Sequence, residues 1–179
     1  MYLWLALDVE SHLARLTEKR KQVDRDLGFC NPCTTLPAHI SLKISFYVRT
    51  AETEAVLATV RDLFSRQKPF SVSVLGMERE GNVLWLRIAP CEELTALHGE
   101  LCRLLEQNHE IHPHPYDLDY KFHVSLAMSD NAEILSHMEK ALGTESLPVT
   151  LPVDTFLVGT SDTGLPGEYT VRERIAMVP

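Results

Sequence analysis

The stretch "PAHISLKISF", residues 37–46, decides how the fold of this chain is interpreted. Polar and apolar residues alternate along it, which is typical of a strand with one buried face. Such a strand would place His39, Ser41 and Lys43 on one side and apolar residues, Ile40 and Leu42 among them, on the other. The sequence therefore predicts a strand here whose polar face carries a histidine, a serine and a lysine.

A second stretch, "YKFHVSLAMS" at residues 120–129, repeats this pattern. It contains His123 and Ser125 at the same spacing, and Lys121 falls on the same predicted face. One histidine followed by an apolar residue, a serine and a leucine would be a weak signal, but two copies at the start of two strands are a strong one. If the two strands face each other, their polar sides line a single cleft.

The remaining sequence alternates between strand-like and helix-like patterns. Helices are predicted where apolar residues recur with helical spacing, and Ser11 and Gly28 are expected to bound the first of them. The predicted strands cover residues 2–9, 38–48, 70–79, 83–90, 120–129, 149–160 and 168–178, and the helices 11–27, 51–66, 91–107 and 131–142. This order predicts an α+β fold with two pseudo-symmetric lobes, each an antiparallel sheet with helices packed outside, around a central cleft. The whole chain, 1–179, is expected to form one domain.

Length and composition limit the class of protein. The chain has 179 residues and a net charge of −8, which favours one domain and argues against a large surface for duplex DNA. No run of about 18 apolar residues occurs, so we expect no membrane span. Four cysteines and no basic leader before the first strand favour reduced thiols in the cytoplasm. The oligomeric state is not indicated by any of these features.

The paired motifs resemble the signature of the 2H phosphoesterase superfamily, which includes 2′-5′ RNA ligase-like proteins and cyclic nucleotide phosphodiesterases. That signature is two His–apolar–Ser/Thr–apolar motifs, one in each lobe of a pseudo-twofold fold. The resemblance covers nearly the whole chain in layout, is specific at residues 39–42 and 123–126, and extends more loosely to the closing hairpin, residues 156–175. It implies a metal-independent phosphoesterase without a cofactor, acting on a small nucleotide or an RNA end at a 2′,3′-cyclic phosphate or a 2′-5′ linkage.

The resemblance also implies roles for the motif residues. One of His39 and His123 would be the general base and the other the general acid, and the sequence does not say which. Imidazole titrates near neutral pH, so it serves both roles, and in-line displacement at phosphorus needs two separate proton-transfer groups. Ser41 and Ser125 would donate hydrogen bonds to the non-bridging oxygens as charge builds on them.

Four further residues are expected to contact the substrate. Lys43 and Lys121 would add positive potential from the polar faces of the two motif strands. Trp4 lies on the face of the first strand opposite its leucines, so it would point into the cleft and stack on a base. Tyr169, in the closing strand, would line the same cleft.

Two other functions remain open besides that of an enzyme. The first is a module that binds a nucleotide or RNA end with little turnover. The second is a metal or redox protein centred on Cys30 and Cys33, although a zinc knuckle needs a second pair with the same spacing and a redox pair would be expected to open a helix. The histidines at 109, 112 and 114 lie in a proline-rich segment without the spacing of a hydrolytic metal site, so we expect solvated loop residues there.

Overall fold

Strands and helices alternate along the chain in the computed structural model, which describes residues 1–178. The strands are β1 (Tyr2–Asp8), β2 (His39–Ser41), β3 (Phe46–Tyr47), β4 (Phe70–Glu80), β5 (Val83–Ile88), β6 (His123–Met128), β7 (Thr150–Val153), β8 (Thr155–Ser161) and β9 (Thr170–Ala176). The α-helices are α1 (Ala14–Leu27), α2 (Thr53–Phe64), α3 (Glu92–His109) and α4 (Ala132–Leu142). Short 3₁₀ helices are η1 (Glu10–Leu13), η2 (Pro32–Thr34), η3 (Thr50–Glu52) and η4 (Pro115–Asp117).

The strands form two antiparallel sheets. The first has the order β2-β1-β8-β9, with β3 also paired to β1, and the second has the order β6-β5-β4-β7. Each motif strand therefore lies at one end of its sheet, and β2 and β6 lie next to each other where the two sheets meet. The α+β architecture with two lobes is confirmed.

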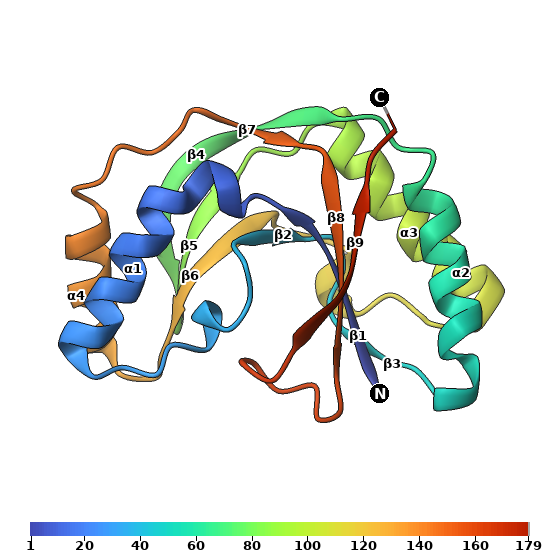
Figure 1. The fold of residues 1–179 in the computed structure, drawn as a ribbon, viewed down its shortest axis with the longest axis horizontal. Coiled ribbons are helices and arrows are strands. Elements are labelled where there is room, and N and C mark those ends of the chain that lie inside the picture. Colours follow the sequence, from blue (N-terminus) through green and yellow to red (C-terminus); the bar gives the residue numbers. More distant parts are fainter. Residues whose placement is uncertain (179) are drawn as a thin grey trace.

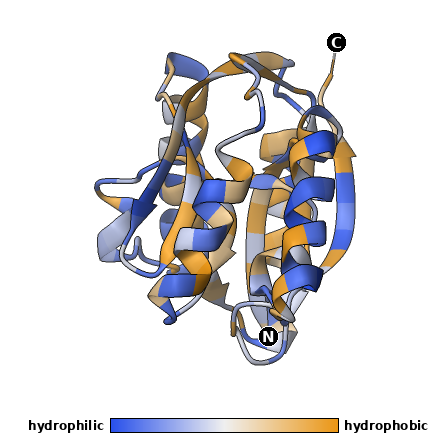
Figure 2. Cartoon of the chain, turned by 90° about the vertical axis from the view of Figure 1, so that its left-hand side faces the viewer, coloured by the Kyte–Doolittle hydropathy of each residue, from blue (hydrophilic) through white to orange (hydrophobic). Residues whose placement is uncertain are grey.

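Helices cover the outer faces of the two sheets, and Figure 1 shows how they are shared. The pair α1 and α4 packs beside β4, β5 and β6, whereas α2 and α3 pack together beside the first sheet. The stacked rings of Phe64 on α2 and Phe156 on β8, with centroids 3.8 Å apart, tie α2 to that sheet. Figure 2 shows hydrophilic and hydrophobic residues alternating along the helices on the α1 and α4 side, as expected when one stripe of each helix is buried.

The connections exchange helices between the lobes. Helix α1 connects β1 to β2 in the first sheet but packs on the second sheet, and α3 connects β5 to β6 in the second sheet but packs beside α2. The units β1-α1-β2 and β5-α3-β6 are therefore equivalent, and each ends in a motif strand. This repeated unit is the structural basis of the pseudo-symmetry.

The core follows the predicted alternation of the first strand. Leu3, Leu5 and Leu7 are fully buried in the main apolar cluster, while Trp4 and Ala6 belong to a separate small cluster on the opposite face of β1. No helix within residues 1–178 is both long enough and apolar enough to cross a membrane.

Two predicted strands are each divided in the structure. The segment 38–48 is not one strand: β2 ends at Ser41, and β3 begins only at Phe46. The chain leaves the sheet between them because Asp117 accepts hydrogen bonds from the Lys43 ammonium and the Ile44 amide. The segment 149–160 forms β7 in the second sheet and β8 in the first, with the change at Asp154.

The start of the first helix also differs from the prediction. A 3₁₀ turn, η1, begins at Glu10, and its start has no capping side chain at the residue before it. Ser11 is therefore inside this turn and is not the N-cap. The Asp8 carboxylate instead accepts a hydrogen bond from the Glu10 amide at 3.0 Å. Gly28 ends α1 as predicted, in the left-handed conformation with φ of 60°.

Candidate active site

A cavity of about 350 Å³ lies where β2 and β6 meet. His39, Ser41, His123 and Ser125 all line it. The two motifs are 84 residues apart in the sequence, and the pairing of the sheets brings them to the two sides of one space. The prediction that the two polar strand faces share a cleft thus agrees with where the structure places the four residues.

The two imidazole rings are held in the same way. His39 Nδ1 lies 2.7 Å from the carbonyl oxygen of Pro37, and His123 Nδ1 lies 2.6 Å from the carbonyl oxygen of Lys121. In both cases the partner is the residue two positions earlier. Because a carbonyl oxygen only accepts hydrogen bonds, Nδ1 must carry the hydrogen in each ring. Nε2 is then the nitrogen that exchanges protons: an acceptor in the neutral ring and a donor in the charged ring.

Burial keeps both rings neutral. Loss of solvent is the main cause that lowers the pKa of His39, from 6.5 to about 4, and the nearby charges of His123 and Arg20 lower it further. The pKa of His123 is also lowered, again chiefly by burial. The effect of His123 on the pKa of His39 agrees with their position in one small space. An anionic phosphate between them would favour the charged form of each ring.

Each ring packs against one of the two tryptophans of the chain. Trp4 on β1 meets His39 edge to face with centroids 4.3 Å apart, and the ring centroids of Trp85 on β5 and His123 are also 4.3 Å apart. The Trp4 indole also donates a hydrogen bond to Ser41 Oγ at 3.1 Å. This bond occupies one acceptor position of the Ser41 hydroxyl.

The cavity geometry and the sequence agree with a known family. A profile of the 2′-5′ RNA ligase superfamily matches residues 8–164. The chain belongs to this superfamily. Its matched segment includes both histidine–serine motifs, so the resemblance to 2H phosphoesterases inferred from those motifs is confirmed. Membership makes the chain a phosphodiesterase- or ligase-type enzyme of nucleotide or RNA phosphodiesters.

Solved structures show the same fold across nearly the whole chain. The protein TT0787 of Thermus thermophilus is 21% identical, with a TM-score of 0.67 and coverage of 98% of this chain and 97% of that one. LigT of Escherichia coli, crystallised with 3′-AMP, is 17% identical, with a TM-score of 0.62 and coverage of 99% and 98%. At these identities the likeness concerns the fold. No curated protein sequence matches the chain.

In this superfamily member the two predicted lysines are already engaged. Lys43 lines the cavity but is only 2% exposed, and its ammonium forms an ion pair with Asp117. Burial raises the pKa of Asp117, and the bonds from Lys43 and two backbone amides outweigh this and hold the pKa below its ordinary value. Lys121 is exposed, does not line the cavity and binds Glu80 at 2.8 Å. Neither lysine therefore adds the free positive potential to the cavity that the sequence predicted.

Trp4 and Tyr169 do line the cavity. Trp4 is only 6% exposed, so it supports His39 and Ser41 rather than offering a free face to a base. Tyr169 is half-buried, and its hydroxyl donates a hydrogen bond to the carbonyl of Gly164 at 3.3 Å. Burial raises the pKa of Tyr169, so its hydroxyl stays protonated at neutral pH.

The cysteine pair has a structural explanation. Cys30 and Cys33 are free thiols, and Asn31 between them caps η2 by accepting a hydrogen bond from the Cys33 amide. Cys33 lines the cavity, and burial raises the pKa of its thiol to about 11. A thiol with this pKa is a weak nucleophile and a weak metal ligand near neutral pH.

The histidines after α3 have separate local partners. His109 Nε2 lies 2.7 Å from the Thr59 hydroxyl, His112 binds Glu106, and His114 caps η4. Across residues 1–178, no group of three or more His, Cys, Asp or Glu side chains is arranged to hold a metal ion. The three histidines therefore do not converge on one point.

Sequence patterns did not reveal the residues whose side chains hydrogen-bond to the backbone in and next to the two motifs. His98 on α3 places its two ring nitrogens 2.7 Å from the Leu42 carbonyl and 2.9 Å from the Asp117 carbonyl. Arg20 on α1 donates to the Ser125 carbonyl, and Asn31 donates to the Leu126 carbonyl at 2.9 Å. These contacts join residues far apart in the sequence. The only signal for one of them was the position of Arg20 on the buried stripe of α1, which it shares with Leu16 and Val23.

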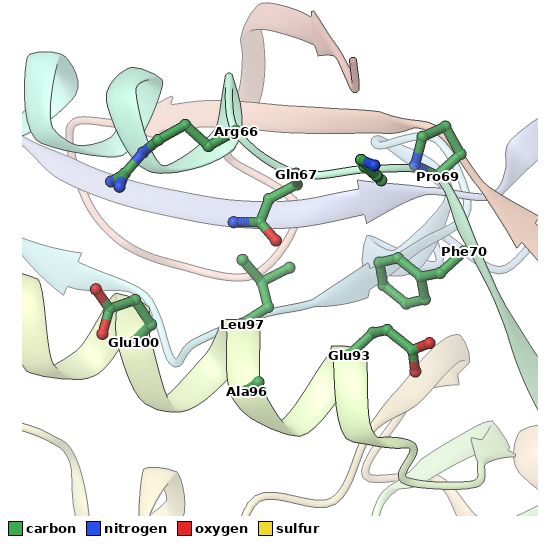
Figure 3. A pocket seen from close by; sticks show the side chains of 9 residues that line it. Arg66, Gln67, Pro69, Phe70, Glu93, Ala96, Leu97 and Glu100 are labelled. Atoms are coloured by element: carbon green, nitrogen blue, oxygen red, sulfur yellow. The ribbon is translucent and has the colours of Figure 1, made fainter. Parts of the chain in front are cut away.

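A larger cavity, of about 660 Å³, lies away from the motifs, between α3 and the segment joining α2 to β4. Figure 3 shows Arg66 and Glu100 at one end of it, and Phe70 and Glu93 at the other. Among the described residues that line it, none is a histidine, a cysteine or a serine. The larger cavity is therefore not the one that contains the two motifs, and the four motif residues line the smaller one.

Proposed function

We propose that this protein is a metal-independent phosphoesterase that acts on nucleotide or RNA-end phosphodiesters, at a 2′,3′-cyclic phosphate or a 2′-5′ linkage, by two-histidine general acid–base catalysis. The observation that carries the proposal is the matched pair of imidazoles in one cavity. Each has Nδ1 bound to its own backbone and Nε2 left to exchange a proton.

The chemistry follows from this tautomer. One neutral ring takes a proton at Nε2 from the attacking water or ribose hydroxyl, while the other ring, charged, gives its Nε2 proton to the leaving oxygen. Ser41 and Ser125 donate hydrogen bonds to the non-bridging oxygens, where negative charge increases. The proton gained by one ring and lost by the other leaves the pair ready for the reverse transfer, so the same site supports ester formation and ester cleavage.

The size of the cavity supports a small substrate. About 350 Å³ lies at the small end of the range for ligand pockets and suits a single nucleotide. The related LigT of Escherichia coli was crystallised with 3′-AMP and with ATP, which is consistent with a nucleotide or an RNA end in the equivalent position here.

The test is turnover of a panel of 2′,3′-cyclic nucleotides and 2′-5′ linked dinucleotides in the presence of EDTA, scored by the phosphate isomer released. We expect turnover with chelator present, and a loss of about 10²–10⁴-fold in kcat/KM in both His39→Ala and His123→Ala. His137→Ala removes an exposed histidine of α4 and is the control. Full activity in either motif variant contradicts the proposal.

The alternative function, a binding module for a nucleotide or RNA end, gives a different result in the same assay. It predicts saturable binding of the panel compounds without turnover, and binding that survives replacement of either motif histidine. The lowered pKa values of both rings favour the enzyme, because a simple anion-binding site would gain from charged rings.

A further inference from the structure

Arg20 is buried without a matching negative charge. It lies on α1, is 1% exposed, and its Nη1 donates to the Ser125 carbonyl at 3.3 Å. Within residues 1–178, Nε has no hydrogen-bond partner and no carboxylate comes within ion-pair distance of the guanidinium. A buried cation without an ion-pair partner is costly, and each such group in a folded protein calls for an explanation.

The cavity lacks a free positive charge. Lys43 is the one lysine or arginine among the described residues that line it, and Asp117 already neutralises that charge. Both histidines are held neutral by burial. A phosphodiester carries a negative charge, and a site for it needs a positive potential to offset the loss of water.

The charge of Arg20 reaches this cavity. It lowers the pKa of His39 and opposes the burial effect on the pKa of Cys33, and both residues line the cavity. The cation does not line the cavity, and it contacts β6 through the bond from Nη1 to the Ser125 carbonyl. Its position is fixed by burial, so it exerts this field without touching the substrate.

Two carboxylates modulate the charge of Arg20. Asp24 is one turn further along α1, and Glu10 precedes the helix. Asp24 is 7% exposed and accepts hydrogen bonds from Asn31, while Glu10 accepts from the Ala38 amide and the Thr17 hydroxyl. Both carboxylates are thus directed to other donors and neutralise Arg20 only in part.

We propose that Arg20 is a positioning residue for the phosphate site: it fixes the Ser125 backbone and supplies, from outside the cavity lining, the positive potential that the lining lacks. The inference deepens the proposed function, on which it rests for the identity of the ligand. Opposite unit charges about 10 Å apart interact by an amount that corresponds to roughly tenfold in affinity at the effective dielectric of a protein. An effect of this size on phosphate binding is therefore expected.

The test is a titration with inorganic phosphate, followed by ³¹P NMR, of four variants on α1. Arg20→Gln keeps a donor and removes the charge, and we expect roughly tenfold weaker phosphate binding. Arg20→Lys keeps the charge and should retain most of the affinity. Asp24→Asn removes the partly opposing charge and should tighten binding about threefold. Asp26→Asn makes the same change at an exposed site of the same helix and should leave affinity unchanged.

A pH profile distinguishes an electrostatic role from a structural one. Because the Arg20 cation disfavours the charged form of His39, Arg20→Gln should shift the acidic limb of kcat/KM to higher pH. Opposite signs for Arg20→Gln and Asp24→Asn are a result that damage to the fold does not produce.

The proposal is overturned if Arg20→Gln binds phosphate as the parent protein does, or if both charge-removing variants weaken binding alike. If Arg20→Gln does not fold, Asp24→Asn decides: without tighter binding the proposal fails. Phosphate binding needs no turnover, so intact binding effects in a protein that cleaves none of the panel compounds would refute the proposed function and leave this inference standing.

Discussion

The two histidine–serine motifs share their local geometry but differ in what surrounds them. In both, Nδ1 faces the carbonyl two residues earlier and a tryptophan from the adjacent strand packs on the ring. The first motif is followed by a buried ion pair, Lys43 with Asp117. The second is held by a buried arginine whose charge is not paired within the described residues. The repeated backbone thus fixes where protons move, and the surroundings set the electrostatics of each side.

The difference extends to the rings themselves. Burial lowers the pKa of both rings, to about 4 for His39; the charges of His123 and Arg20 lower the pKa of His39 further, whereas the charge of Glu80 raises that of His123. The charges around His39 thus favour its neutral form, and the charge near His123 favours its protonated form. The pseudo-symmetry of the chain does not extend to the charged groups around the two rings.

The largest stability difference between the motifs should come from the ion pair. Asp117→Asn leaves the Lys43 ammonium buried without a counter-charge, and we expect the free energy of unfolding to fall by about 3–5 kcal/mol. Urea unfolding measures this. Asp119→Asn changes an exposed carboxylate two residues later and is the control. A loss for Asp117→Asn as small as that of the control would show that the first motif does not depend on the pair.

The second prediction concerns the pH dependence of stability. In the unfolded chain His39 takes up a proton near pH 6.5, whereas in the folded protein it does so only near pH 4. The folded state therefore loses stability as pH falls from 6.5 to 4, by about 3 kcal/mol at most, and gains nothing further above 6.5.

His39→Gln should remove this acid sensitivity. Unfolding measured at pH 7 and at pH 4 is expected to show a smaller loss in His39→Gln than in the parent protein. His123→Gln should also reduce the loss, because burial lowers the pKa of that ring as well, and the exposed His137→Gln provides the control. Equal acid sensitivity in His39→Gln and the parent protein would contradict the assignment of the neutral ring.

The smallest expected effect is a difference in kcat/KM between variants of the two tryptophans. Trp4→Phe loses the hydrogen bond to Ser41, worth about 1 kcal/mol, so kcat/KM should fall about fivefold. The Trp85 indole donates to Glu78 instead, so Trp85→Phe should lower kcat/KM by about twofold at most. Steady-state kinetics on one 2′,3′-cyclic nucleotide compares the two. A larger loss for Trp85→Phe would reverse the roles assigned to the two indoles.

The sequence predicted the fold class and the family, and it placed the four motif residues where they share a cavity. This worked because strand alternation is a local property, and because the same tetrapeptide pattern occurs twice. The division of residues 38–48 into two strands was missed because it depends on Asp117, which is distant in sequence. Local patterns carry no information on such a partner.

The lysines illustrate the same limit. Alternation placed Lys43 and Lys121 on the polar faces, but their charges are taken up by Asp117 and Glu80. The supporting residue Arg20 was not identified because helical periodicity treats a polar residue on a buried stripe as an exception rather than a site. The predicted hairpin paired the strand of Trp85 with residues 70–79, so it gave no sign that Trp85 packs on His123 of the second motif.

The exchange of helices between the lobes has a consequence for how the chain can be divided. A break at the β4–β5 turn would leave β1 and β4 in one fragment and their partners β8 and β5 in the other, and each sheet would be separated from part of its helical cover. Neither fragment would be able to bury its own apolar surface. Co-expressed fragments should therefore accumulate only as a complemented heterodimer.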